Sequence, residues 1–367
     1  MTRQTLLAFA AVVVAACGGD QRGSAGASSA ATTPVASSQR ASGAVDLTGA
    51  GATFPQPIYS KWMSDYQAKT GVKINYQSIG SGGGIRQLSE GTVDFGATDS
   101  PMKDDEMAKA KGGAILHVPT VLGAVVVTYN LPELGQTPLK LSGPVVADIF
   151  LGKVKKWNDA RIAALNPGAK LPAGDVLVVH RSDGSGTTYI FSSYLAAVSP
   201  EWARAPGAAK ELKWPTGLGA KGNEGVAGQV KQLPGTVGYV ELAYAKQNGL
   251  AYADVQNASG QFVRPSIESV TAAAAGVIEK LPPQTDYRIS VVNAPGASAY
   301  PISSFTWIIL YRNQTDAAKA KKLQDFLRWA LSDGERSAAA LDYAPLPPAL
   351  AARLRQELDS IVVGSTP

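Results

Sequence analysis

The chain has 367 residues, of which 45% are hydrophobic, so it is long enough for two or three globular domains with substantial cores. Its 38 glycines and 23 prolines are many for a helical protein and favour an α/β fold with frequent loops. The net charge of +5 is spread thinly, and the densest basic run, KVKK at 153–156, has no interleaved aromatic residues, which argues against a nucleic-acid-binding protein. A single cysteine excludes an intramolecular disulfide and a cysteine-based metal cluster.

The first 16 residues have the plan of an export signal. A basic residue, Arg3, precedes an apolar run at 6–14 that is too short to span a bilayer as a permanent helix. Small residues then come directly before Cys17, an order that resembles the lipobox of bacterial lipoproteins, although Val14 stands where that pattern usually has leucine. We therefore expect a lipoprotein signal peptide at 1–16 and lipidation of Cys17. The alternative is a soluble export signal with an incidental cysteine.

The segment that follows is composed mainly of Gly, Ser, Ala and Thr and contains little that could form a core. We expect residues 17–44 to comprise the lipidated cysteine and a flexible tether. Random-coil scaling gives such a tether a reach of roughly 30 Å from the membrane.

The first folded segment predicts a strand, a glycine loop and a helix. The strand ends in the glycines at 49–51, Thr53 can cap the helix, and Pro55 suits the first helical turn. Gly71 then ends the helix. Apolar residues recur every four positions within this helix: Ile58, Trp62 and Tyr66.

Two further segments repeat this plan. Residues 72–77 alternate as a strand and are followed by a glycine-rich loop and a helix, with Ser81 near the helix N-terminus. A third apolar strand, at 93–98, ends directly before Asp99. Because ligands bind outside the carboxyl ends of the strands in a parallel sheet, Thr53, Ser81 and Asp99 could lie on one rim.

The stretch RSDGSGTT at 181–188 joins an apolar, β-branched run to a segment with helical spacing. At such a helix N-terminus the free N–H groups and the helix dipole stabilise an anion, glycine lets a ligand approach the backbone, and hydroxyls add donors. By itself the stretch fits an anion cradle, a capped turn or a nucleophile loop. Three glycine-rich loops at helix N-termini favour the cradle, because independent turns would not need to share this chemistry.

Motifs for nucleotide binding and serine hydrolysis fail in this chain. No glycine loop is followed by the Lys and Ser or Thr of a P-loop, and Ile85 stands where a dinucleotide fingerprint needs its third glycine. A serine hydrolase with the motif Gly-x-Ser-x-Gly would have glycines two residues before and two residues after Ser185, but Asp183 and Thr187 occupy those positions.

The chain offers few residues for a general base or a metal site. Its two histidines, His117 and His180, are expected to be buried or edge residues rather than catalytic ones. Paired histidines with metal spacing are absent from the sequence. The acidic run at 104–106 looks like the first turn of an exposed helix, so we expect no metal site.

Several segments in chain order resemble the periplasmic phosphate-binding proteins that serve the high-affinity phosphate ABC transporter. They are LTGAGATFPQPIYSKW, YQSIGSGGG, VDFGATDSP, KVKKWND, RSDGSGTT and LPGTVGYVELAYAKQN, and the similarity extends from about residue 45 to LDYAPLP near the C-terminus. The resemblance implies a two-lobed α/β periplasmic binding protein of type II-like fold, which closes by hinge motion on a ligand in the interlobe cleft.

The resemblance also implies the extents of the two lobes. One would comprise residues 45–128 plus 296–367, and the other residues 129–295. The segment DAAKAKKLQDFLRWAL reads as an amphipathic helix that contributes to the core of the first lobe. Its apolar face carries Leu323, Phe326, Leu327 and Ala330.

Position by position, the resemblance implies a phosphate site with donors from three loops. Phe54 would donate through its backbone, Asp99 would accept, and Asp183 would hold the guanidinium of Arg181 in place. The implied phosphate-binding residues are Thr53, Phe54, Ser81, Asp99, Arg181, Asp183, Ser185, Gly186 and Thr187.

Asp99 has a physical rationale in an anion site. A carboxylate can only accept a hydrogen bond, so it suits a ligand that still carries a proton, as phosphate does near neutral pH. Fully ionised sulfate would present lone pairs to it, and in a dehydrated pocket that repulsion costs about several kcal/mol. The alternative is that Asp99 caps a helix before Ser-Pro.

The function expected from the sequence is therefore phosphate binding outside the cytoplasmic membrane. The protein would be a monomer in the periplasm or at the cell surface, anchored through lipid, and would deliver phosphate to the permease subunits of an ABC transporter, without catalysis, metal or cofactor. One alternative is a binding protein for another oxyanion such as sulfate or arsenate. The other is a secreted phosphatase or esterase that uses Ser185.

Overall fold

The computed structural model describes residues 47–135, 137–282 and 285–363. The expected signal peptide, Cys17 and the tether lie outside these residues. Across the described part of the chain, no helix combines the length and apolarity needed to cross a membrane. The same residues contain no group of three or more His, Cys, Asp or Glu side chains arranged to hold a metal ion.

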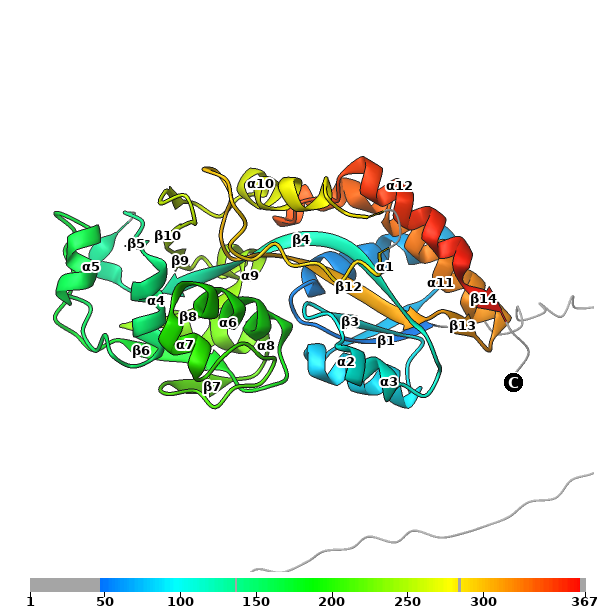
Figure 1. The fold of residues 1–367 in the computed structure, drawn as a ribbon, viewed down its shortest axis with the longest axis horizontal. Helices are drawn as coiled ribbons and strands as arrows, with labels where there is room; N and C mark the ends of the chain where they lie inside the picture. Colours follow the sequence, from blue (N-terminus) through cyan, green and yellow to red (C-terminus); the bar gives the residue numbers. More distant parts are fainter. Residues whose placement is uncertain (1–46, 136, 283–284, 364–367) are drawn as a thin grey trace, which may run out of the picture. The chain divides into compact units, whose positions relative to one another are not determined.

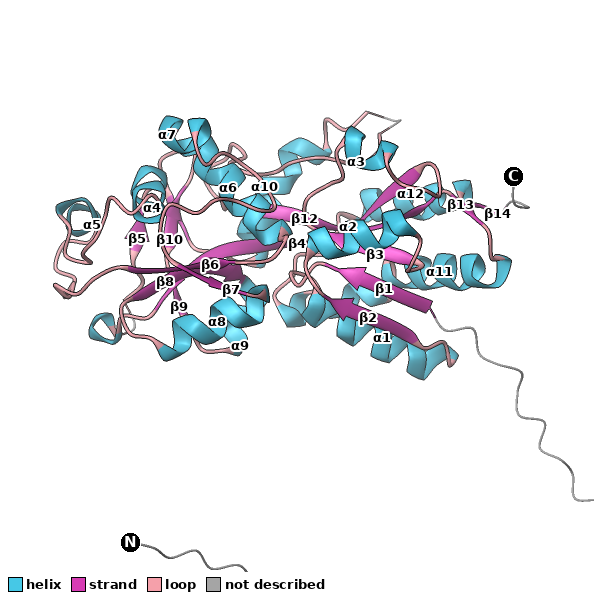
Figure 2. Ribbon diagram, turned by 90° about the horizontal axis from the view of Figure 1, so that it is seen from below, coloured by secondary structure: helices cyan, strands magenta, loops and turns pink. Residues whose placement is uncertain are grey.

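The described residues form the two lobes of an α/β protein, joined by a single nine-stranded sheet (Figures 1 and 2). The strand order is β2-β1-β3-β12-β4-β8-β6-β7, and β9 also pairs with β4. The long strand β4 (Ile115–Tyr129) continues from one lobe into the other. Its first part pairs with β12 (Ser303–Tyr311), and its last five residues pair with β8 (Thr236–Glu241). A shared strand thus connects the lobes.

The remaining strands are shorter than β4 and β12. The other strands are β1 (Leu47–Gly51), β2 (Ile74–Ser78), β3 (Phe95–Thr98), β5 (Lys140–Leu141), β6 (Leu177–Arg181), β7 (Leu218–Ala220), β9 (Ala251–Tyr252), β10 (Asp254–Gln256), β11 (Phe262–Val263), β13 (Asn313–Gln314) and β14 (Val362–Val363). The α-helices are α1 (Gln56–Thr70), α2 (Ser81–Glu90), α3 (Asp104–Ala108), α4 (Gly143–Phe150), α5 (Ala160–Leu165), α6 (Gly186–Val198), α7 (Pro200–Arg204), α8 (Gly222–Gln232), α9 (Leu242–Gln247), α10 (Ile267–Ile278), α11 (Ala317–Ala330) and α12 (Pro348–Glu357). Short 3-10 turns are η1 (Pro132–Leu134), η2 (Gly334–Ser337), η3 (Ala339–Leu341) and η4 (Leu358–Ser360).

The repeated strand, loop and helix plan is present in the first lobe. β1 lies between β2 and β3 and is parallel to both, so their carboxyl ends meet at one edge of the sheet. In α1 the predicted apolar face is buried, and Gly71 ends the helix in the left-handed conformation with φ 76°. Tyr66 of α1 packs edge-on against Phe326 of α11 at 5.3 Å between ring centroids. The predicted core face of α11 is therefore confirmed.

The first turns of two helices differ from the sequence prediction. α1 begins at Gln56 without a side-chain cap, because the Thr53 hydroxyl contacts Asn223 instead. α2 begins at Ser81, as predicted, but it includes the glycine run that the sequence assigned to a loop. A Cβ atom at Gly84 would lie 2.6 Å from the carbonyl oxygen of Ala50, so the glycines allow this helix to lie directly on β1 and β3.

The second lobe repeats the plan with β6, which pairs in parallel with both β7 and β8. α6 follows β6 and buries most of its apolar side chains, as its spacing predicts.

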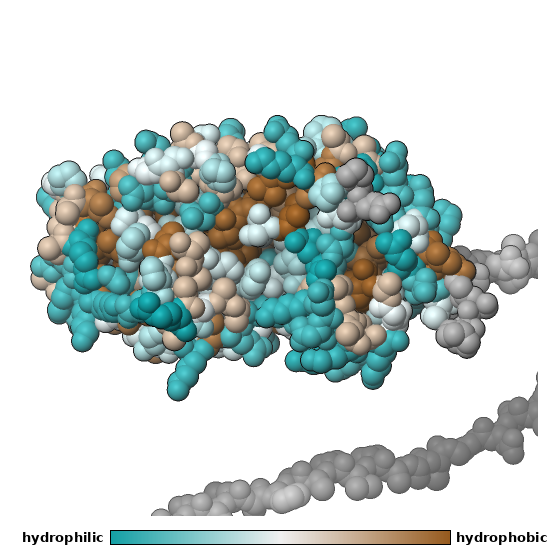
Figure 3. Space-filling model, in the orientation of Figure 1, coloured by the Kyte–Doolittle hydropathy of each residue, from teal (hydrophilic) through white to brown (hydrophobic). Residues whose placement is uncertain are grey.

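Figure 3 shows hydrophilic residues over much of one face of the molecule, with apolar residues visible between them. In the basic run, Lys153 and Lys156 are exposed and form ion pairs with Glu201 and Asp175, which fits a solvated surface.

Candidate functional site

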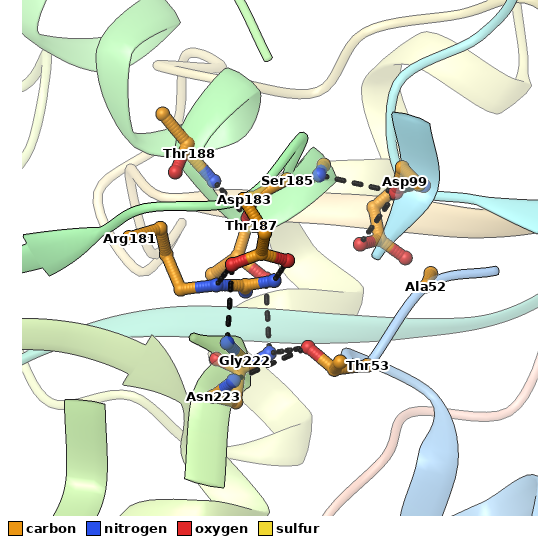
Figure 4. A network of polar contacts seen from close by, with 12 residues as sticks. Ala52, Thr53, Asp99, Arg181, Asp183, Ser185, Thr187, Thr188, Gly222 and Asn223 are labelled. Carbon is orange, nitrogen blue, oxygen red and sulfur yellow. Dashed lines mark hydrogen bonds and ion pairs between the residues drawn. The ribbon is translucent and has the colours of Figure 1, made fainter. Parts of the chain in front are cut away.

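Polar side chains from both lobes meet where β1, β3 and β6 end and where α2, α6 and α8 begin (Figure 4). The side chains of this cluster are almost completely buried, with relative exposures between 0% and 3% for its core members. Those members are Thr53, Ser81, Asp99, Arg181, Ser185, Thr187 and Asn223. The structure thus brings together residues that the sequence separates by well over 100 positions.

The Ser81 hydroxyl joins the two lobes at one side of the site. Its oxygen accepts hydrogen bonds from the backbone N–H of Asp99 at 3.2 Å and of Gly186 at 3.1 Å. It donates to Oδ2 of Asp99 at 3.4 Å. A Cβ atom at Gly186 would lie 2.5 Å from this hydroxyl oxygen, so only glycine lets α6 begin so close to the first lobe.

Asp99 is a buried carboxyl group with partners on both oxygens. Its Oδ1 accepts a hydrogen bond from the Thr306 hydroxyl at 2.7 Å. Burial raises the pKa of Asp99 to about 7, although the hydrogen bond from Thr306, the charge of Arg181 and the hydrogen bond from Ser81 oppose this change. Asp99 therefore titrates near neutral pH, where a proton can be held by the carboxylate or by a neighbouring group.

Arg181 is fixed by Asp183, as the sequence suggested. Nε of Arg181 donates to Oδ1 of Asp183 at 2.7 Å and Nη2 donates to Oδ2 at 2.5 Å, which is a bidentate pair. The N–H of Gly222 adds a hydrogen bond to Oδ1 at 3.1 Å. Burial would raise the pKa of Asp183, but the hydrogen bonds and charge of Arg181 lower it below its usual value. The carboxylate stays ionised and holds the guanidinium plane.

Asn223 connects two threonines from different lobes and was not predicted from the sequence. Its Nδ2 donates to the hydroxyl oxygens of Thr53 at 2.7 Å and Thr187 at 3.1 Å. It follows Gly222 at the start of α8, where β7 has just ended. The same pattern of strand, glycine loop and helix that pointed to the other loops could have identified this one.

Thr53 and Phe54 are held by tyrosines rather than by helix capping. The hydroxyl of Tyr244 donates to the Thr53 carbonyl oxygen at 2.6 Å, and that of Tyr343 donates to the Phe54 carbonyl oxygen at 2.6 Å. The Phe54 side chain is fully buried. The loop that carries both residues is thereby fixed against α9 and the C-terminal part of the chain.

Ser185 acts as the N-cap of α6 in the structure. Its hydroxyl oxygen accepts the backbone N–H of Thr188 at 3.0 Å, a usual capping contact. His180 stacks on Trp214 at 4.7 Å and directs Nδ1 to the carbonyl oxygen of Arg181, so it is not paired with Ser185. His117 is buried in β4, and burial lowers its pKa to about 4.

Further contacts join the lobes beside the site. The N–H of Gly82 donates to the carbonyl oxygen of Gly184 at 2.8 Å. Lys210 forms an ion pair with Glu106 of α3, and both side chains are largely buried. The first turn of α3 is acidic as predicted, but Glu106 is not a freely solvated member of it, because it faces the other lobe.

Comparisons with known proteins agree with this architecture. The model of the PBP superfamily domain matches residues 28–334. The phosphate-binding protein PstS of Pasteurella multocida is 50% identical over 304 residues, which cover 83% of this chain and 87% of that protein. PstS of Xylella fastidiosa (strain Temecula1) is 47% identical over 313 residues, which cover 85% of each.

Solved structures support the fold. A phosphate-binding protein from Stenotrophomonas maltophilia has a TM-score of 0.68 at 20% identity, with 85% of this chain and 93% of that chain covered. The high-affinity periplasmic phosphate-binding protein PfluDING has a TM-score of 0.67 at 22% identity, with 85% and 93% covered. At these identities the structures establish the two-lobed fold, while the sequence relatives establish the family. The chain belongs to the PBP superfamily and, within it, to the family of PstS phosphate-binding proteins.

Proposed function

We propose that this protein binds inorganic phosphate outside the cytoplasmic membrane and delivers it to an ABC transporter for import. One observation carries the proposal: a fixed guanidinium, several hydroxyls and two helix N-termini converge beside a single buried carboxyl group that titrates near neutral pH. Relatives with 47–50% identity are named phosphate-binding proteins. The combination suits an oxyanion that still carries a proton.

The proposed site surrounds the anion with donors from both lobes. The positive ends of α2 and α6 and the charge of Arg181 stabilise its negative charge. Asp183 does not touch the anion in this proposal, and instead keeps the guanidinium oriented. The proposed phosphate-binding set is Thr53, Phe54, Ser81, Asp99, Arg181, Ser185, Gly186 and Thr187, with Asp183 as its support.

Asp99 provides the proposed selectivity. When ionised, its carboxylate accepts a hydrogen bond from the protonated oxygen of a hydrogen-phosphate ion. Sulfate has no proton to donate at neutral pH, so the same carboxylate repels it. Arsenate carries a proton as phosphate does, and it remains the alternative ligand within this class.

We also propose that the protein is not an enzyme and needs no cofactor. The capping role of Ser185 supports this, because its hydroxyl is engaged with Thr188 and no histidine of the described residues contacts it. A phosphatase would release product from a phosphomonoester, and Ser185→Ala would abolish that release. We expect no release above the buffer rate from either the original protein or the variant.

The proposed organisation follows from the family and the N-terminal sequence. The protein would be a monomer anchored through lipidated Cys17 after removal of residues 1–16, with residues 18–44 as a tether. The lobes would comprise residues 45–128 plus 296–367 and residues 129–295, and would close on phosphate by hinge motion to present the loaded form to the permease.

Calorimetric titration tests the function directly. The purified protein is stripped of bound ligand by unfolding and refolding, and is then titrated with phosphate and with sulfate at neutral pH. We expect one-to-one phosphate binding and much weaker sulfate binding, with loss of that preference in Asp99→Asn. Equal affinity for both anions, or no binding of either, would contradict the proposal.

A further inference from the structure

We infer that Asn223 is a positioning residue that turns the hydroxyls of Thr53 and Thr187 into obligate hydrogen-bond donors toward the bound anion. The inference rests on the proposed phosphate site and adds a residue to it. It concerns the direction of two hydroxyl protons, which the positions of the heavy atoms determine in this network (Figure 4).

The orientation of the Asn223 amide is fixed by its surroundings. Its Oδ1 accepts a hydrogen bond from the backbone N–H of Glu241 at 3.0 Å. A backbone N–H can only donate, so the atom that faces it must be the amide oxygen and not the amide nitrogen. The NH₂ group of Asn223 therefore points to the two threonine hydroxyls.

Each threonine hydroxyl has one proton and two acceptor positions. The Thr53 hydroxyl oxygen accepts hydrogen bonds from the side-chain Nδ2 of Asn223 at 2.7 Å and from the backbone N–H of Asn223 at 3.3 Å. The Thr187 hydroxyl oxygen accepts hydrogen bonds from the same Nδ2 at 3.1 Å and from Nη1 of Arg181 at 3.4 Å. Because N–H donors occupy the acceptor positions of both oxygens, the remaining role of each hydroxyl is to donate its own proton.

This arrangement restricts what the site can bind. Thr53 and Thr187 are both buried, so a ligand atom next to them must accept a hydrogen bond. Protonated oxygens of the ligand are thus directed away from the threonines and toward Asp99, which accepts a hydrogen bond when ionised. Asn223 and Asp99 together would select the orientation of a singly or doubly charged phosphate.

Asn223 also links this donor set to the contact between the lobes. Thr53 follows β1 in the first lobe, whereas Asn223 and Thr187 begin helices of the second lobe. The contact at 2.7 Å between Nδ2 of Asn223 and Thr53 therefore forms only when the lobes approach each other. Closure of the two lobes therefore also fixes the direction of the Thr53 hydroxyl proton.

The main test is Asn223→Asp, which keeps the shape of the side chain but replaces the NH₂ group by an oxygen. The new oxygen would accept the threonine protons and turn them away from the anion, and its charge would repel phosphate. We expect phosphate affinity, measured by calorimetry on the full chain, to fall by about 100-fold or more. A fall of less than about threefold would overturn the inference.

A double-mutant cycle separates positioning from a purely structural role. In the original protein, Asn223→Ala should weaken phosphate binding by about 10-fold, because both hydroxyls lose their fixed orientation. In a Thr53→Val background, where one hydroxyl is absent, the same change should cost at least about threefold less. An equal cost in both backgrounds would mean that Asn223 acts only by holding α8 against β8, and would overturn the inference.

Asn257 supplies a matched control. It is also buried, and its Nδ2 donates to the backbone carbonyl oxygens of Gly296, Ala297 and Ala299, away from the proposed site. Asn257→Ala should lower the melting temperature without changing phosphate affinity beyond about twofold. If the original protein binds no phosphate, the proposed function fails. If it binds phosphate and the Asn223 variants bind equally well, only this inference fails.

Discussion

Asp99 shows how burial changes the behaviour of a single carboxyl group. The folded protein raises its pKa from 3.8 to about 7, chiefly because burial penalises the charged form. The folded state therefore holds the Asp99 proton more tightly than the unfolded state does. The contribution of the protonated Asp99 to the free energy of unfolding is therefore fully present below the unfolded-state pKa, and it is lost as the pH rises through about 7.

We predict from this shift that Asp99→Asn removes a pH-dependent cost from the phosphate-free protein. The free energy of unfolding of the variant, relative to the original protein, should increase between pH 4 and pH 8 by roughly 3–5 kcal/mol. Urea unfolding at a series of pH values in phosphate-free buffer measures this difference. If the difference in the free energy of unfolding does not vary with pH, the pKa of Asp99 is not raised in the folded state.

The site residues differ in how far the sequence could predict them. Ser81, Asp99 and Arg181 lie at the ends of strands or the start of a helix, beside recognisable glycine and hydroxyl patterns, and the structure brings them to one place. Asn223 follows the same strand, glycine and helix pattern, but nothing local indicates which residues Asn223 or Thr306 contacts. Their partners Thr53 and Asp99 lie 170 and 207 positions away, and only the folded sheet determines those contacts. Local patterns thus identified loops, while long-range packing determined which side chains meet.

At the scale of helices and strands, the sequence pattern predicted β1, β2, β3 and β6 and the buried faces of α1, α6 and α11. The sequence also placed Ser81 at the helix N-terminus, where α2 begins, but the glycines that follow were assigned to a loop, because a run of glycines is more typical of a loop than of a helix. The helix forms there because the absence of side chains lets it lie directly on β1 and β3. The long strand β4 was also not predicted, since its role depends on β12 and β8, which come much later in the chain.

Gly84 offers a test of this close packing. A Cβ atom there would lie 2.6 Å from the Ala50 carbonyl oxygen and 2.8 Å from the Ala97 carbonyl oxygen, and backbone atoms cannot easily move aside. We predict that Gly84→Ala lowers the free energy of unfolding by about 2–4 kcal/mol despite the better helix propensity of alanine. Chemical unfolding followed by circular dichroism provides the measurement.

The control for this prediction is Gly228 in α8, where an added Cβ meets nothing within 4 Å. Gly228→Ala should leave stability unchanged or increase it by up to about 1 kcal/mol. Equal effects of the two substitutions would contradict the close approach of α2 to the strands.

For the whole molecule, the contacts between lobes determine how long the proposed closed state lasts. Lys210 and Glu106 form an ion pair between the lobes, with side-chain exposures of 17% and 25%. The carbonyl oxygen of Lys210 also accepts a hydrogen bond from the backbone N–H of Ser185, the N-cap residue of α6 at the site. Lys210 thus contacts the first lobe through its side chain and the anion-binding loop through its backbone.

We predict that breaking this ion pair speeds phosphate release more than it slows phosphate capture. Lys210→Met keeps the aliphatic stem but removes the charge that Glu106 attracts, so the closed arrangement loses a contact that the open one lacks. Partial burial limits solvent screening, and a contribution of roughly 1 kcal/mol corresponds to a dissociation rate about fivefold higher. Release of radiolabelled phosphate into excess unlabelled phosphate measures this rate.

Substitutions of Glu106 and of an ion pair within one lobe serve as controls. Glu106→Gln should increase the dissociation rate by a similar factor, and combining it with Lys210→Met should add little, because each change already removes the same interaction. Lys61→Met, which breaks an exposed pair with Asp65 inside α1, should leave the rate unchanged. If the two interlobe changes were fully additive, or if Lys61→Met had the same effect, the ion pair would not be what holds the lobes together, and closure would depend on the site contacts alone.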